Sequence, residues 1–124
     1  MSVAILRQGD YLIASIQSDL SDSEILALRD DLSERIGRLR CRGLVVDVAA
    51  LEVIDSFVAR ALRQIAITAR LRGAETVIVG VSPEIAFTMV RLGMSIPNVH
   101  TALDLEQGLQ VLGRLTSQLP PPRP

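Results

Sequence analysis

The residues from which enzymes build active sites are scarce in this chain. It has one histidine, His100, and one cysteine, Cys41, and all thirteen of its cationic side chains are arginines. A single histidine and a single cysteine exclude the usual zinc ligand sets, and a chain without lysine forms neither a Schiff base nor a P-loop lysine contact. His100 could belong to a Ser-His-Asp triad, but nothing in the sequence places a nucleophilic serine beside it. We therefore expect no metal, no cofactor and no catalysis.

Some polar groups have both a chemical and a plain interpretation. Cys41 lies between Arg40 and Arg42, which could lower the pKa of the thiol and make it reactive, although a partly buried cysteine at a helix end is the simpler interpretation. Asp30 and Asp31 are adjacent carboxylates that point in different directions on a helix, which favours solvated surface charge. Four arginines near the end of the same helix could bind phosphate, but a cluster at a helix C-terminus explains them more simply. They are Arg35, Arg38, Arg40 and Arg42.

The most informative stretch is residues 47–57, where a buried strand is followed by a loop and then by a helix. In a parallel α/β sheet this position is the carboxyl edge, where binding sites are usually found. Ser56 stands where the helix begins, so free N–H groups and the positive end of the helix dipole would favour a phosphate added to it. Arg60 lies one turn along on the same face and could screen that charge, whereas Asp55 would oppose it. The alternative is that Asp55 or Ser56 only caps the helix, and the residues alone leave both interpretations open.

Hydrophobic periodicity predicts the elements that position this stretch. Two short apolar runs joined by Gly9-Asp10 indicate a hairpin, and helical and strand patterns then alternate in the order ββαβαβαβα. Such alternation predicts an α/β fold with a mostly parallel sheet and an antiparallel edge hairpin. The predicted strands cover residues 3–7, 11–16, 44–48, 76–81 and 99–102. The predicted helices run from Ser21 to a stop at Gly43, over residues 57–71 with a stop at Gly73, from Pro83 to Leu92 with a stop at Gly93, and from Asp104 with Leu105, Leu109, Leu112 and Leu119 pointing inward.

Length and composition limit the remaining classes of protein. The chain has 124 residues, which suits one domain over residues 1–119, followed by a frayed proline-rich tail at residues 120–124. A net charge of −1 and only three aromatic residues give no reason to expect a nucleic acid or a membrane as a partner. The first residues do not resemble a signal peptide, and no apolar stretch approaches the roughly 20 residues that span a bilayer. We therefore expect a cytoplasmic protein.

The strand end at Asp47-Val48, followed by Ile54-Asp55-Ser56-Phe57, resembles the signature of STAS domains, the family of anti-sigma-factor antagonists. Three further segments are similar to the same family, at residues 12–17, 73–74 and 101–109. The resemblance spans about residues 5–115, and it is greatest to the small, single-domain RsbS-type members that belong to the bacterial stressosome.

The resemblance implies a STAS fold, with a sheet of four to five strands and about four flanking helices, and no catalytic activity. It implies a phosphorylatable scaffold that assembles with larger RsbR-type paralogues into a large complex and retains a switch serine kinase of the histidine-kinase-like ATPase fold. Carried over by position, Ser56 would be phosphorylated by that kinase, which would release it, and a PP2C-type phosphatase would reset the serine. The partner-binding surface would comprise Asp55, Ser56, Phe57 and Arg60. The alternative is a stand-alone anti-sigma-factor antagonist switched at Ser56.

Self-association is also expected, through surfaces away from Ser56. An edge strand offers unpaired backbone groups that a partner can cover, and the first hairpin near Tyr11 and Ile13 is the expected contact, together with helix edges. The Ser56 end must stay open because a kinase has to reach it.

Overall fold

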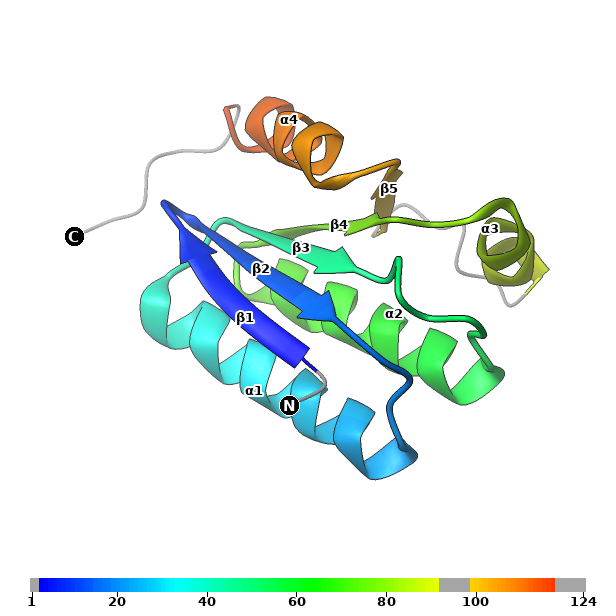
Figure 1. Cartoon of the computed structure of the whole chain (residues 1–124). Helices are drawn as coiled ribbons and strands as arrows, with labels where there is room; N and C mark the ends of the chain where they lie inside the picture. The colour runs from blue at the N-terminus through cyan, green and yellow to red at the C-terminus, as the bar shows by residue number, and fades with distance from the viewer. Residues whose placement is uncertain (1–2, 92–98, 118–124) are drawn as a thin grey trace.

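The computed structural model describes residues 3–91 and 99–117, and it confirms the predicted order of elements (Figure 1). The strands are β1 (Val3–Gln8), β2 (Tyr11–Ile16), β3 (Gly43–Asp47), β4 (Glu75–Val79) and β5 (His100–Ala102). The helices are α1 (Asp22–Leu39), α2 (Ser56–Leu71), α3 (Pro83–Arg91) and α4 (Leu105–Thr116). Within the described ranges, no helix is long and apolar enough to cross a membrane. The predictions for Leu92, Gly93, Leu119 and the tail at 120–124 lie outside the described residues.

A five-stranded sheet in the order β1-β2-β3-β4-β5 forms the centre of the fold. β1 and β2 are antiparallel and joined at Gly9-Asp10, where Gly9 has a φ of 59°. All the other neighbouring strands are parallel. α1 and α2 lie side by side on one face of the sheet, and α4 packs on the other face against β3, β4 and β5 (Figure 1). The predicted mixed sheet with its antiparallel hairpin is confirmed.

Alternation along the strands sends side chains into two separate cores. Leu12 and Ile16 of β2 face α1 and α2, whereas Ile13 faces α4 and packs with Leu112. β3 contributes to both cores, since four of its five residues are buried, as expected from its unbroken apolar run. The core therefore has one layer on each side of the sheet.

The position of α4 corrects the expected self-association site. Tyr11 and Ile13 belong to β2, which is an inner strand paired on both sides. Ile13 is buried under α4, and Tyr11 Oη lies 2.8 Å from Thr116 Oγ1 at the end of that helix. The free edge of the hairpin is β1.

The first residue of α4, Leu105, was predicted to point inward, and the structure shows that it does not. Leu105 is 38% exposed, whereas Leu109 is half-buried and Leu112 is fully buried. The helix makes its closest approach to the sheet one turn further along, at Gly108, where an added Cβ would lie 2.6 Å from Val79 Cγ1. Contact with the sheet therefore begins at Gly108, and Leu105 remains outside it.

α1 begins as predicted and ends earlier. Ser21 Oγ accepts a hydrogen bond from Glu24 N at 3.2 Å, and Glu24 Oε1 accepts one from Ser21 N at 3.0 Å, which completes a capping box. The helix ends at Leu39 because Arg40 adopts the left-handed backbone conformation, with φ 53°. Gly43 does not stop the helix; it is the first residue of β3, where neighbouring side chains leave no room for a Cβ.

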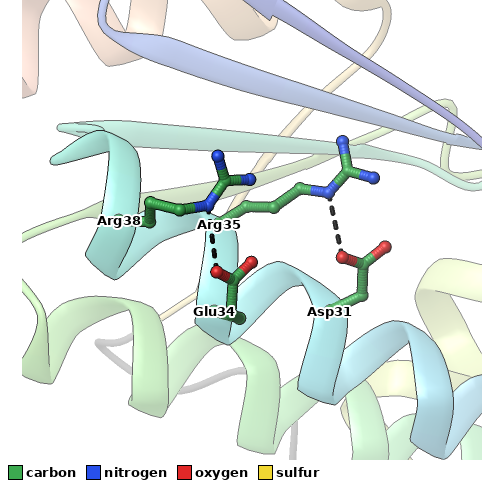
Figure 2. Close-up of polar contacts among 4 residues, drawn as sticks. All are labelled: Asp31, Glu34, Arg35 and Arg38. Carbon is green, nitrogen blue, oxygen red and sulfur yellow. Dashed lines mark hydrogen bonds and ion pairs between the residues drawn. The ribbon is translucent and has the colours of Figure 1, made fainter.

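The arginines along α1 form ion pairs within the helix (Figure 2). Arg35 Nε lies 2.9 Å from Asp31 Oδ1, and Arg38 Nε lies 2.9 Å from Glu34 Oε1, each pair spanning one turn. Arg42 donates to a backbone carbonyl at the end of α4. These contacts account for Arg35, Arg38 and Arg42, three of the four arginines of the predicted cluster, by partners within the protein.

Candidate functional site

Ser56 lies at the carboxyl edge of the parallel strands, where residues 48–55 lead from β3 to α2 (Figure 1). Val48 at the start of this loop is buried, and further along it Leu51 and Ile54 are buried too, so that all three pack into the core formed with α1 and α2. Between Leu51 and Ile54, Val53 is 70% exposed. The loop is thus anchored in the core while its outer side and the start of α2 face solvent.

The turn after β3 depends on Asp47 and Gly80. Asp47 Oδ1 accepts a hydrogen bond from Ala49 N at 2.9 Å, which closes the turn. Gly80 follows β4 with φ 78°, and a Cβ at this position would lie 2.7 Å from Ala49 Cβ. Glycine therefore permits both the left-handed backbone and the close approach of the two loops. It also ends β4 at Val79, two residues before the predicted end.

Asp55 is the N-cap of α2, which identifies the capping residue that the sequence left open. Its Oδ1 accepts a hydrogen bond from Val58 N at 2.8 Å, and its carbonyl oxygen accepts one from Ala59 N at 3.0 Å. Ser56 is the first residue of the helix and is exposed. Its hydroxyl makes no hydrogen bond to any residue that the structure describes. Ser56 has no capping role, and its Oγ is open to solvent.

Two other serines at helix starts provide a comparison. Ser21 Oγ accepts from Glu24 N, and Ser82 Oγ, just before α3, accepts from Ile85 N, both at 3.2 Å. Both hydroxyls are thus committed to holding a helix end. Of these three serines, Ser56 is the one with an unengaged hydroxyl.

The other residues of the predicted partner-binding surface differ in how far they are exposed beside Ser56. Arg60 is exposed, and its Nε donates to the carbonyl oxygen of Ser56 at 3.4 Å. Phe57 is half-buried and packs against the core beneath α2. The structure therefore brings Asp55, Ser56 and Arg60 together at the surface, whereas Phe57 contributes mainly to packing.

Exposed apolar side chains at the same edge of the sheet were missed by sequence reasoning. Val53 is exposed, and Leu103, in the loop after β5, is 72% exposed. A hollow of about 220 Å³ lies beside Val53 and Asp55, between the loop of residues 48–55 and the start of α1. The available signal was the spacing of Leu51, Val53 and Ile54, since three apolar residues so close in a loop cannot all face the core. The edge thus combines a free hydroxyl, a carboxylate and apolar surface.

The remaining candidates do not form a second site. Cys41 is 2% exposed, and its burial raises the pKa of the thiol, while the nearby Arg7 charge acts in the opposite direction. The simpler interpretation of Cys41 is confirmed, with the side chain buried more completely than expected. His100 Nε2 lies 3.5 Å from Glu75 Oε2, and its contact is therefore with a carboxylate and not with a serine. In the described part of the chain, no group of three potential ligands could hold a metal ion.

Adjacent carboxylates on α1 are also structural. Asp30 pairs with Arg29 at 3.1 Å, whereas Asp31 pairs with Arg35. The two carboxylates thus have different partners, and both belong to the solvated surface of the helix.

Comparison with known proteins identifies the family. The STAS domain family matches residues 2–108, and the chain belongs to this family. Among solved structures, a serine-to-glutamate variant of RsbS from Moorella thermoacetica is 35% identical, with a TM-score of 0.84, over 95% of this chain and 100% of that one. A chain in the molecular architecture of the stressosome, a signal integration and transduction hub, is 32% identical, with a TM-score of 0.75, over 91% of this chain and 98% of that one.

Curated relatives include longer proteins. The RsbT co-antagonist protein RsbRA of Bacillus subtilis is 30% identical over 91 residues, which are 73% of this chain and 33% of RsbRA. RsbRD of the same organism is 28% identical over 97 residues, or 78% of this chain and 35% of RsbRD. The chain thus spans about a third of the length of these relatives. The unphosphorylated anti-sigma factor antagonist SpoIIAA, at 13% identity and a TM-score of 0.69 over 91% of this chain and 96% of that one, shares the fold.

Proposed function

We propose that the chain is a non-catalytic, phosphorylatable scaffold and antagonist in a cytoplasmic stressosome assembly. In its unmodified form it retains a switch serine kinase of the histidine-kinase-like ATPase fold, and phosphorylation of Ser56 releases that kinase. The observation that carries this proposal is the exposed, unengaged hydroxyl of Ser56 at the start of α2. The similarity to RsbS over nearly the whole chain supports it.

The start of α2 suits a phosphoserine. The kinase transfers the γ-phosphoryl group of ATP to Ser56 Oγ, ADP leaves, and the hydroxyl proton passes to a base of the kinase. The N–H groups of Ser56 and Phe57 have no acceptor within the helix, and the helix dipole favours the added charge of about −1.5 to −2. Arg60, already in contact with the Ser56 carbonyl, is placed to screen the phosphate. The site therefore tolerates the modification without refolding.

Release of the kinase follows from the charge added beside Asp55. In the unmodified chain this edge presents one carboxylate among apolar side chains such as Val53, a surface that a partner can cover. A phosphate next to Asp55 more than doubles the local negative charge, and burying it in an interface is costly because it is strongly hydrated. A PP2C-type phosphatase would reverse the change by hydrolysing the phosphoserine.

Assembly with RsbR-type paralogues is the second half of the proposal. It is supported by the similarity to RsbRA and RsbRD and to the stressosome chain. The alternative is a stand-alone anti-sigma-factor antagonist switched at Ser56, with which the fold shared with SpoIIAA is compatible. Native mass measurement of the chain mixed with an RsbR-type paralogue separates them, because only the scaffold enters a larger species.

Phosphopeptide mapping with the cognate serine kinase and ATP tests the assignment of Ser56. Label should appear chiefly on Ser56, and Ser56→Ala should abolish it and retain the kinase permanently. Ser82→Ala is the matched control, because Ser82 also begins a helix but uses its hydroxyl as a cap. Label found mainly on Ser82 or Thr88 would overturn the assignment.

A further inference from the structure

β1 is an edge strand of six residues, and no described segment pairs with its outer side. The two-residue turn at Gly9-Asp10 makes Gln8 and Tyr11 a hydrogen-bonded pair, so every second residue of β1 bonds to β2. The main-chain groups of the alternate residues, Val3, Ile5 and Arg7, therefore point away from the sheet. Such a row of unpaired groups is a template for a further strand.

A groove of about 510 Å³ runs along this edge between β1 and α1. β1 contributes the half-buried Val3 and Ile5, and α1 contributes Ala27 and Leu28 near the middle of the groove. On the opposite face of the sheet, Leu6 is 64% exposed. Both faces of the edge thus present apolar side chains that no other described residue covers fully.

Charged side chains line both ends of the α1 side of the groove, with Glu24 at one end and the ion pair of Asp31 and Arg35 at the other. Glu24 lines the end near the start of α1, and its hydrogen bonds with Ser21 hold the pKa of the carboxyl below its usual value and so keep it ionised. Glu24 uses Oε1 for that contact, which leaves Oε2 available. Arg35 lines the other end, bonded to Asp31 through Nε, and its two terminal nitrogens point away from that contact (Figure 2).

We propose that a second copy of this chain binds along β1 about a two-fold axis, so that the two five-stranded sheets join into one. The axis passes beside Ile5, which places Ile5 opposite Ile5 of the second copy and Val3 opposite its Arg7. In this antiparallel register, the outward main-chain groups of all three residues find partners. On the other face, Leu6 lies beside Ala4 of the second copy and loses its exposure.

The same axis pairs the charged ends of the groove. The two α1 helices run antiparallel across it, so Glu24 of each copy faces Arg35 of the other. Val3 to Arg7 spans about 13 Å along the strand and Glu24 to Arg35 about 16 Å along the helix, so the strand and helix contacts would extend over similar lengths of the interface. The surface is thus self-complementary in hydrogen bonding, apolar contact and charge, which a two-fold dimer requires.

The inference deepens the proposed scaffold role and rests on it for its biological meaning, but its test needs the purified chain alone. No residue that lines the groove belongs to residues 47–60, although the start of α1 lies beside the start of α2, where Leu20 lines both the groove and the hollow next to Asp55. Loss of the dimer would leave phosphorylation of Ser56 intact, so the two proposals fail separately.

Charge reversal tests the pairing. Light scattering coupled to size-exclusion chromatography should give the unaltered chain twice its monomer mass of 13.5 kDa. Glu24→Arg and Arg35→Glu should each weaken the dimer by about tenfold or more, because each puts like charges at both contacts. An equimolar mixture of the two variants should restore dimers, because both contacts then join opposite charges.

Arg38→Glu is the matched control. It breaks an ion pair with Glu34 on the same helix but outside the groove, and it should leave the dimer unchanged. Hydrogen exchange should show protected amides at Val3, Ile5 and Arg7 in the dimer and lose that protection in Arg35→Glu. A chain that stays monomeric at its highest soluble concentration, or dimerises only with an RsbR-type paralogue, overturns the proposal. So does a mixture no more dimeric than the single variants.

Discussion

Asp55→Ala and Ser56→Ala, two neighbouring substitutions at the start of α2, should affect stability and switching in opposite ways. Asp55→Ala removes the oxygen that accepts from Val58 N at 2.8 Å. Loss of such an N-cap costs about 1 kcal/mol, which in a domain of this size lowers Tm by about 3–6 °C. Ser56→Ala removes an exposed hydroxyl without a hydrogen bond, so the free energy of unfolding should change by less than about 0.5 kcal/mol.

Urea unfolding followed by circular dichroism measures both changes, provided that the slopes agree among variants. Labelling with the cognate kinase and ATP should then fail for Ser56→Ala and persist for Asp55→Ala. Asp104→Ala is the control for capping, because Asp104 Oδ1 accepts from Gln107 N at 2.9 Å in the same geometry at the start of α4. It should lose similar stability without affecting the label. If Ser56→Ala costs about 1 kcal/mol and Asp55→Ala costs nothing, the capping assignment is wrong.

Four further outcomes are expected. Ser56→Asp should weaken kinase retention only partly in a pull-down titration, because one carboxylate carries about half the charge of a phosphoserine; complete release would contradict this. Cys41 should react slowly with a thiol reagent in the native protein and quickly in urea, because burial raises its pKa; equal rates would refute the buried position. Gly80→Ala should lower the free energy of unfolding by about 1–3 kcal/mol, because φ is 78° and the Cβ would meet the neighbouring loop; a neutral result in urea unfolding would count against that geometry. The pKa of Glu24 is lowered in the fold by its hydrogen bonds with Ser21, so its stabilising effect is present above its unfolded pKa and should be lost as the pH falls through the folded value. Acid titration of stability should show less of this loss in Glu24→Gln.

Much of the fold could be predicted because its signals are local. The capping box of Ser21 and Glu24 depends on a spacing within one helical turn, and the hairpin turn between β1 and β2 depends only on Gly9 and Asp10. The buried run that forms β3 is likewise continuous in sequence. Each of these patterns has few alternative structures, so sequence alone was sufficient.

Positions that depend on distant contacts were predicted less well. Tyr11 and Ile13 are covered by α4, which follows them by about ninety residues, and no local pattern shows where that helix will lie. Leu105 fits an apolar stripe but falls outside the contact that begins at Gly108. Arg40 ends α1 in a left-handed conformation that arginine rarely adopts, so no residue preference indicated it.

The sequence placed Asp55 and Ser56 at the carboxyl edge of the sheet, where the structure has them, but it left open which of the two caps α2. Asp55 and Ser56 are both good N-cap residues, and a shift of one position exchanges their roles. The burial of Ile54 immediately before them, at 3% exposure, sets which residue stands outside the first turn. That burial is a tertiary contact, which explains why the sequence left the choice of capping residue open.

Asp55 caps α2, whereas Ser56 is the proposed phosphorylation site, and this separation of the two roles has a consequence for an assembly of many copies. Because the cap is on Asp55, adding or removing a phosphate on Ser56 breaks no bond that holds α2 in place. The modified and unmodified chains would then have the same outline and differ only in surface charge. Neighbouring subunits would pack against either form equally well, and each copy could be marked independently. The number of retained kinases would therefore vary continuously with the fraction of phosphorylated subunits. The assembly would release kinases gradually instead of dissociating at a threshold.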